Sequence, residues 1–226
     1  MTNAADPSSL TAFVAAKGHS SRVPRKNMRD FDGSPLFHRI LQTLLDADRV
    51  GQVVLDSDSD EILDSCAAAL PDVVLVRRPT ELEGDDVPMN LLIGNAFKET
   101  GAQVMLQTHA TNPLLKPATV DGAIEAYFAA DGITSLMTVT PLQTRLYWDD
   151  LRPINHDPNE LIPTQDLPVV YEENSNVYIF DRDAFDRCGH RVTDACMAYP
   201  MDPLEATDID NETDFTLAVA LNAQGI

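Results

Sequence analysis

The chain has 226 residues, enough to bury the core of one large α/β domain, and we expect a single domain over residues 1–226. Its 36 acidic and 16 basic residues give a formal net charge of −20, which argues against nucleic acid and anionic membranes as partners. Three cysteines without a C-x-x-C pair indicate neither a disulfide framework nor a zinc site, and no apolar segment is long enough to span a bilayer, so we expect a cytoplasmic protein.

Apolar periodicity predicts strands and helices that alternate along most of the chain. Short apolar runs predict strands over residues 10–16, 52–55, 73–76, 104–106, 134–139 and 176–180. Apolar residues at helical spacing predict helices over residues 36–45, 62–70, 89–97, 117–128 and 215–221. This alternation predicts a three-layer α/β fold, in which a mostly parallel twisted sheet is covered by helices on both faces.

Residues 141–170 interrupt the alternation. They contain five prolines and little periodicity. We therefore expect an insertion arm in this segment, and we predict that it forms dimer contacts in a homodimer.

The loop after the first strand gathers cations on a chain that is otherwise acidic. It runs from Lys17 to Asn27 and includes Arg22 and Lys26 among glycine and serine residues. Small residues let backbone N–H groups approach an anion and cations neutralise phosphate oxygens, so the loop is typical of a nucleoside triphosphate site. Its spacing matches neither the Walker A nor the G-x-G-x-x-G pattern. A solvated basic turn is the alternative interpretation.

Two aspartates near the carboxyl end predict a metal site. Asp208 and Asp210 are two residues apart, so in an extended segment they point to one side and could hold a hard cation such as Mg²⁺. The alternative is that these acidic residues cap the last helix, where acidic side chains are favoured. We assign that capping role to Asp214.

Several motifs, in order, resemble the acylneuraminate cytidylyltransferase family over about residues 10 to 222. This family includes the synthetases of CMP-sialic acid and of the CMP derivatives of other nonulosonic and 3-deoxy-octulosonic acids. The motifs are the loop from Lys17 to Asn27, Leu55-Asp-Ser-Asp58, Arg78-Pro-Thr-Glu-Leu82, Leu106-Gln-Thr-His-Ala-Thr-Asn-Pro-Leu114, the segment from Gln165 to Phe180, and the acidic run from Glu205 to Asp214. Each motif alone is weak, but their order and intervals together are specific.

The resemblance implies a Rossmann-like nucleotidyltransferase fold and a magnesium-dependent transfer of CMP from CTP to a small acidic acceptor, with release of pyrophosphate. It implies that the catalytic residues are Lys17, Arg22, Lys26, Asp208 and Asp210, and that the two aspartates hold the metal. It implies that the nucleotide is bound by Ala16, Lys17, Gly18, Ser20, Ser21, Asn27, Asp58 and Arg78.

For the acceptor, the resemblance implies binding by Gln107, Gln165, Glu172 and Asn174. Local turns are an alternative role for Asn174. Where sialic acid enzymes of the family often have an arginine just before Gln165, this chain has Thr164. We therefore consider Arg145 as a replacement for that arginine.

Three other functions are compatible with the sequence. The acceptor of a cytidylyltransferase could be a phosphonate or another non-sugar acid. A glycosyltransferase would use a similar sheet, but its acidic metal motif would be expected near the middle of the chain. A third alternative is a relative that binds CTP without turning it over.

Overall fold

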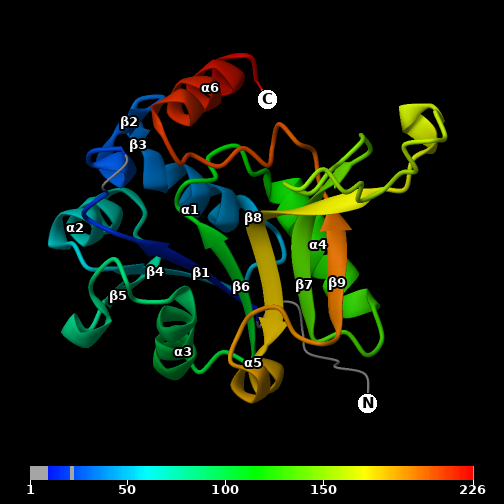
Figure 1. Cartoon of the computed structure of the whole chain (residues 1–226). Coiled ribbons are helices and arrows are strands. Elements are labelled where there is room, and N and C mark those ends of the chain that lie inside the picture. Colours follow the sequence, from blue (N-terminus) through cyan, green and yellow to red (C-terminus); the bar gives the residue numbers. More distant parts are fainter. Residues whose placement is uncertain (1–9, 21–22, 226) are drawn as a thin grey trace.

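A mixed, seven-stranded sheet forms the centre of the molecule (Figure 1). The computed structural model describes residues 10–20 and 23–225. In spatial order the strands are β5 (Val74–Arg77), β4 (Gln52–Ser57), β1 (Thr11–Ala16), β6 (Val104–His109), β8 (Val170–Asp181), β7 (Ser135–Leu142) and β9 (Cys196–Pro200). A separate hairpin joins β2 (Asp30–Phe31) to β3 (Ser34–Pro35).

Strand direction decides where the loops meet. β5, β4, β1 and β6 pair in parallel, whereas β8 is antiparallel to both of its neighbours, β6 and β7. The carboxyl ends of the parallel strands therefore share one edge of the sheet with the amino-terminal half of β8. Ligands of open α/β sheets bind at this edge.

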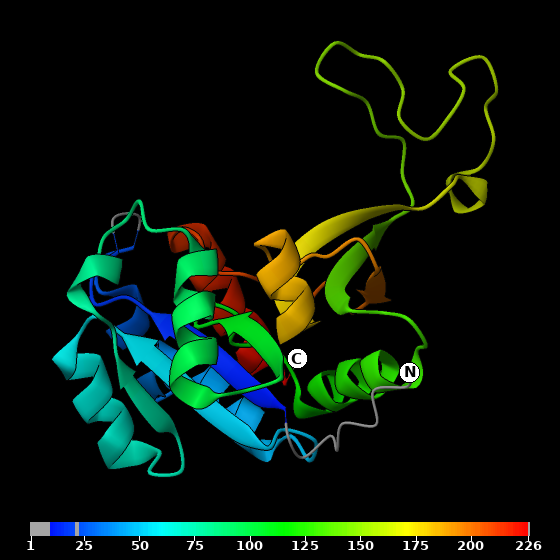
Figure 2. The ribbon, with the colours of Figure 1, turned by 90° about the horizontal axis from the view of Figure 1, so that it is seen from below.

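Side chains alternate between the two faces of β1, and each face is covered by helices (Figure 2). Ala12 and Val14 belong to a core formed with α1 (Leu36–Asp46), α2 (Asp60–Ala69) and α4 (Pro117–Ala129). Phe13 belongs to a second core, formed with α3 (Met89–Thr100) and α5 (Arg182–Cys188). Side chains that point to either face of β1 are mostly apolar, so both faces of this central strand are buried.

The last helix, α6 (Glu212–Ala223), packs against the hairpin rather than against the sheet. Phe215 meets Phe31 edge-on, and Ile209 is buried in the same small cluster. Asn211 caps the helix, and the Asp214 side chain accepts from the Asn211 N–H to complete a capping box. This packing fixes the segment of residues 205–211 beside the amino-terminal loop.

The segment between β7 and β8 extends away from the sheet as an irregular arm (Figure 2). Within residues 143–169 the regular structure consists of one 3₁₀ turn, η4 (Thr164–Asp166), and one β-bridge between Tyr147 and Pro153. Four prolines within residues 143–169 explain this, because proline removes a backbone donor and resists both helix and inner strand.

The three-layer, mostly parallel fold predicted from the sequence is confirmed, including the arm. The sequence prediction lacked α5 and β9, both short, and did not show that β8 is antiparallel. No helix within residues 10–20 and 23–225 is long and apolar enough to cross a membrane.

Candidate active site

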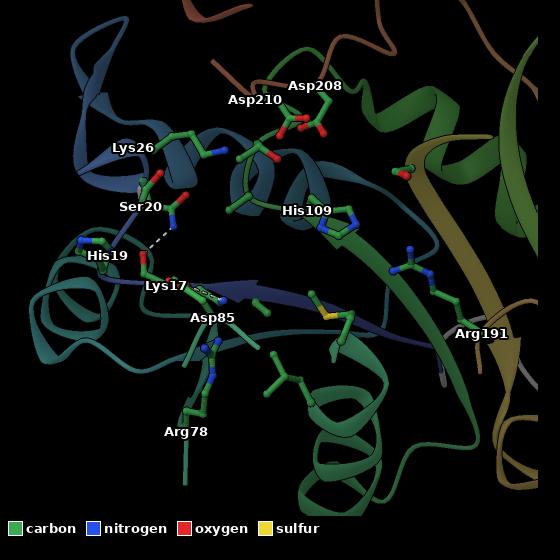
Figure 3. A pocket seen from close by; sticks show the side chains of 17 residues that line it. Lys17, His19, Ser20, Lys26, Arg78, Asp85, His109, Arg191, Asp208 and Asp210 are labelled. Atoms are coloured by element: carbon green, nitrogen blue, oxygen red, sulfur yellow. Dashed lines mark hydrogen bonds and ion pairs between the residues drawn. The ribbon is translucent and has the colours of Figure 1, made fainter. Parts of the chain in front are cut away.

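A cavity of about 430 Å³ lies at the carboxyl edge of the sheet. Its wall includes Lys17 after β1, Arg78 after β5 and His109 at the end of β6, so three parallel strands deliver polar side chains to one place. Asp208 and Asp210 close it from the segment before α6 (Figure 3). Cations and carboxylates from distant parts of the sequence therefore share one cavity.

The turn after β1 is held against the loop after β4. The Gly18 N–H donates to Asp58 Oδ1 at 2.7 Å. A Cβ added at Gly18 would lie 2.7 Å from the Cβ of Ser59, so only glycine fits this approach. Lys17 points toward the cavity, where its ammonium donates to Gly84 O and pairs with Asp85 at 3.2 Å.

Arg78 is almost completely buried beneath the cavity. Its Nε donates to Asp56 at 2.6 Å and its Nη1 to Asp58 at 3.4 Å. Its Nη2 is buried, with no hydrogen-bond partner among the described residues, although Arg78 lines the cavity. Two carboxylates thus stabilise the buried charge and leave one donor available to a ligand.

Asn27 offers an acceptor to the same cavity. Its Nδ2 donates to Lys17 O at 2.8 Å, which fixes the amide beside the loop. Its Oδ1 is buried and has no partner in the part of the chain that the structure describes. A buried carbonyl oxygen of this kind is costly unless a ligand or water satisfies it.

Lys26 connects the amino-terminal loop to the aspartate segment. Its Nζ donates to Ile209 O at 2.6 Å, between the two aspartates. Figure 3 shows its side chain directed toward Asp208 and Asp210. The two predicted halves of the site, separated by about 180 residues of sequence, therefore meet.

Asp208 holds a carboxylate that is not fully satisfied by protein groups. Its Oδ1 is buried, with no hydrogen-bond partner within residues 10–20 and 23–225. Burial raises the pKa of Asp208, although a hydrogen bond from the Thr111 side chain opposes the rise. The Asp214 carboxylate accepts hydrogen bonds from the backbone N–H groups of Asp210 and Asn211. Asn211 and Asp214 therefore cap α6, and the capping role predicted for Asp214 is confirmed.

A second cavity of about 410 Å³ adjoins the first. Ser175, Asp208 and Asp210 line both. Ser175 lies in β8 with a φ of 56°, in the left-handed region that a serine seldom adopts, next to an irregularity in the β7–β8 pairing. Strain of this kind collects at functional sites, and here it lies on the boundary between the cavities.

The second cavity is polar. Glu172 and Asn174, for which the family resemblance implies acceptor binding, both line it. The amide of Asn174 is engaged in the sheet, since its Oδ1 accepts from Thr138 and its Nδ2 donates to Thr140. Asn174 therefore shapes the wall by bridging β7 and β8.

Gln107 is fully buried behind the first cavity. Its Nε2 donates to Thr108 O and lies 3.3 Å from His109 Nε2, and its Oε1 accepts from Arg191. Gln107 thus supports His109 and Arg191, which both line the cavity. Burial, followed by the charges of Arg191 and Lys26, lowers the pKa of His109 to about 4.

The predicted site residues fall into four groups, of which the last, Arg145 and Gln165, lies in the arm. Those that line a cavity are Lys17, Ser20, Lys26, Asn27, Arg78, Glu172, Asn174, Asp208 and Asp210. Four others line neither cavity: Ala16 and Gln107 are buried, and Gly18 and Asp58 join two loops through a hydrogen bond. Ser21 and Arg22 lie outside the described residues.

Arg145 and Gln165, for which an acceptor role was expected, line neither cavity. Arg145 donates to Ile162 O at 2.6 Å, and the backbone oxygen of Gln165 accepts from Gln143. Both lie in the arm, where polar groups of an irregular backbone need partners. Arg191 lines the first cavity but belongs to none of the predicted motifs, because it lies in a connection without periodicity between α5 and β9.

The parallel sheet and the cationic cavity at its carboxyl edge are typical of nucleotide-binding α/β proteins. Comparison with known proteins identifies the class further. Residues 11–222 match the cytidylyltransferase family, and the chain belongs to it. This confirms the family resemblance predicted from the motifs.

Two curated relatives and one solved structure illustrate the similarity. A 3-deoxy-manno-octulosonate cytidylyltransferase of Chlorobium luteolum is 30% identical over 170 residues, which cover 75% of this chain and 62% of the relative. An N-acylneuraminate cytidylyltransferase of Oncorhynchus mykiss is 25% identical over 217 residues, covering 92% of this chain and 49% of the relative. The chain thus spans only about half to three-fifths of the length of these relatives.

The solved structure is a CMP:2-keto-3-deoxy-manno-octonic acid synthetase complexed with CTP. It superposes with a TM-score of 0.70 at 11% identity, covering 96% of this chain and 99% of that one. At this identity the likeness shows that the fold is shared.

Proposed function

We propose that the chain is a cytoplasmic cytidylyltransferase that transfers CMP from CTP to a nonulosonic or 3-deoxy-octulosonic acid and releases pyrophosphate. The observation that carries this proposal is the pair of adjoining cavities with Asp208 and Asp210 on their common boundary. A transfer between two substrates needs both bound side by side, with the reacting atoms between them. The chemistry of the two walls supports assigning the nucleotide to the first cavity and the acceptor to the second.

The first cavity suits a cytidine triphosphate. Lys17 and Lys26 supply positive charge for phosphate oxygens, beside a loop of small residues. The buried Nη2 of Arg78 and Oδ1 of Asn27 offer one donor and one acceptor in a cavity wall. Cytosine and ribose present complementary acceptors and donors, so we assign these two groups to the cytidine end.

The reaction is an in-line substitution at the α-phosphorus of CTP. A hydroxyl oxygen of the acceptor forms a bond to phosphorus, the bond to the bridging oxygen of the β-phosphate breaks, and pyrophosphate leaves with the bonding electron pair. The hydroxyl proton passes to solvent. Lys17 and Lys26 stabilise the charge that grows on the leaving group, which is the main demand of phosphoryl and nucleotidyl transfers.

Asp208 and Asp210 fit a magnesium ion and would hold it at the edge of the nucleotide cavity. The unsatisfied buried oxygen of Asp208 is a hard ligand beside a second carboxylate. No cluster of three or more potential ligands of the His, Cys, Asp or Glu type occurs in the described ranges, and Mg²⁺ commonly takes one or two carboxylates and completes its shell with phosphate and water. Such an ion would polarise the α-phosphate and lower the pKa of the attacking hydroxyl.

We also propose that the arm forms the contact of a homodimer. It exposes large apolar side chains on an extended segment: Leu161 is 91% exposed, Leu151 76% and Trp148 54%. Several large apolar side chains exposed on one segment of a charged protein favour a contact surface there. Light scattering should give twice the monomer mass, and the double substitution Trp148→Ser with Leu161→Ser should give monomers; a wild-type monomer would contradict this part.

A pyrophosphate-release screen tests the proposed function. The protein is assayed with CTP, UTP and ATP, each with a nonulosonic acid, an octulosonic acid and a phosphonate, with and without Mg²⁺. We expect release with CTP, Mg²⁺ and one sugar acid. Release only with the phosphonate would reassign the acceptor, and the absence of release with any acid, despite CTP binding, would favour a binding protein.

A further inference from the structure

Arg191 brings a further cation into the first cavity, beside Lys17, Lys26 and Arg78, from a part of the chain outside the predicted motifs. It lies between α5 and β9 and lines the cavity with His109 and Ser175. Figure 3 shows it on the side of β8, while Lys17 and His19 lie at the opposite end and the two aspartates lie between them. Arg191 is therefore separated from the phosphate loop and lies toward the acceptor side.

The guanidinium of Arg191 is held rigidly by neutral groups. Its Nη1 donates to Gln107 Oε1, and its central carbon lies 3.7 Å from the centre of the Tyr178 ring. Burial and a hydrogen bond to Glu173 raise the pKa of Tyr178 to about 12, so the ring beneath Arg191 remains neutral at pH 7. A guanidinium stacked on an aromatic ring and fixed at one edge loses little entropy when its other donors bind an anion.

Arg191 differs from Lys17 and Arg78, which line the same cavity, in its ion pairs. Lys17 pairs with Asp85, and Arg78 with Asp56 and Asp58. Arg191 makes no salt bridge with any described residue, although the chain carries a net charge of −20. On so acidic a protein, a half-buried arginine that is held by neutral partners and faces a cavity is suited to an external anion.

We infer that Arg191 binds the acid group of the acceptor and makes the site selective for an anionic acceptor over its uncharged ester. The inference rests on the proposed function and deepens it. Arg191 then takes the acceptor-binding role for which we had considered Arg145. A guanidinium can present two parallel N–H donors to a carboxylate or a phosphonate, and a lysine in its place would keep the charge without the fork.

The test measures acceptor binding separately from turnover. N-acetylneuraminate, 3-deoxy-manno-octulosonate and 2-hydroxyethylphosphonate are titrated by calorimetry into the CMP-saturated wild-type protein and into Arg191→Gln, Arg191→Lys and Arg187→Gln. Arg187 is exposed and four residues away, so its variant makes the same change in net charge outside the cavity. The methyl ester of the acid that binds best is titrated in parallel, because it keeps the shape and loses the charge.

We expect Arg191→Gln to weaken binding of the acid by about 10- to 100-fold, the range of a charge-assisted hydrogen bond, and Arg191→Lys by less. Arg187→Gln should change it by less than about twofold, and the ester should bind wild type and Arg191→Gln equally. Loss of packing alone would weaken acid and ester together and would contradict the inference. So would equal acid binding by wild type and Arg191→Gln, or no acid binding by wild type.

Pyrophosphate release from the same proteins separates the two ideas. Arg191-dependent binding of an acid without pyrophosphate release would leave the inference standing and would overturn the proposed function. Pyrophosphate release with the same acceptor KM in wild type and Arg191→Gln would support the proposed function and overturn the inference about Arg191. Dependence on Arg191 with the phosphonate alone would keep the residue's role and change the acid group.

Discussion

Lys26 donates a hydrogen bond to the carbonyl oxygen of Ile209, which lies 183 residues further along the chain. The 2.6 Å contact joins the phosphate loop to the backbone between the two aspartates. An ammonium group in this position neutralises part of the carboxylate charge and also faces the nucleotide cavity. The cationic and the acidic halves of the site are therefore assembled before any substrate binds, which lowers the cost of ordering them later.

Replacing Lys26 by methionine should lower kcat/KM for CTP by about 100- to 1,000-fold, because the variant loses a cation aimed at developing phosphate charge. Methionine keeps most of the length and apolar character of the side chain. Steady-state pyrophosphate release would measure the change. Lys98→Met, on the exposed face of α3, is the matched control and should retain wild-type kinetics. Equal kinetics for both variants would exclude Lys26 from the reaction.

Asp210→Ala should remove most turnover and leave the fold intact. Its carboxylate is exposed, and the box that caps α6 is formed by Asn211 and Asp214, so the loss falls on the cavity rather than on the helix. Pyrophosphate release should fall by at least about 100-fold, on the scale of other electrostatic groups of active sites, with an unchanged melting curve. Asp194→Ala removes an exposed aspartate elsewhere and serves as control. Near-normal activity of Asp210→Ala at any Mg²⁺ concentration would argue against metal ligation.

Arg78→Met should destabilise the protein by about 3–5 kcal/mol, since it leaves the buried carboxylate of Asp56 without its partner. Both side chains are at most 1% exposed, so solvent cannot replace the lost interaction. Urea unfolding would measure the effect. The double substitution Arg78→Met with Asp56→Leu should recover much of the stability but not CTP binding. If the double variant bound CTP normally, Arg78 would have only a structural role.

Local patterns were sufficient to predict most strands of the sheet, most helices and the two segments that meet at the candidate site. Lys17, Lys26, Asp208 and Asp210 each follow or precede an element with clear periodicity, and parallel strands bring their ends together. The direction of β8 depends on how a strand returns after the arm, which no local pattern encodes.

Arg191 was missed for a related reason. Its position depends on contacts with Gln107 and Tyr178, which lie 84 and 13 residues away in the sequence. Interactions between side chains that are distant in sequence leave no spacing to recognise. The same holds for Asp56, whose partner Arg78 directly follows the next strand, β5.

Gly18→Ala should weaken CTP binding without unfolding the protein. The added methyl group would lie 2.7 Å from the Cβ of Ser59, so the loop must move away from β4 and the hydrogen bond from Gly18 N to Asp58 must lengthen. We expect at least a tenfold higher dissociation constant for CTP, measured by calorimetry. Gly94→Ala is a matched control, because its added Cβ would meet Phe185 only at 4.0 Å and alanine favours helix α3. CTP affinity equal to wild type in Gly18→Ala would mean that the loop position does not matter.

His109 should make the protein without nucleotide or metal less stable in mild acid. Its pKa is about 4 in the folded protein against 6.5 as the ordinary value, chiefly because burial disfavours the charged ring. A lowered folded pKa means that the unfolded chain binds more protons between these values, so the stabilisation is complete above pH 6.5 and is lost as the pH falls toward 4. The loss amounts to at most about 3 kcal/mol. Urea unfolding of wild type and His109→Gln at pH 7.5 and pH 4.5 should show a steeper decline for wild type, and parallel declines would show that the ring titrates normally.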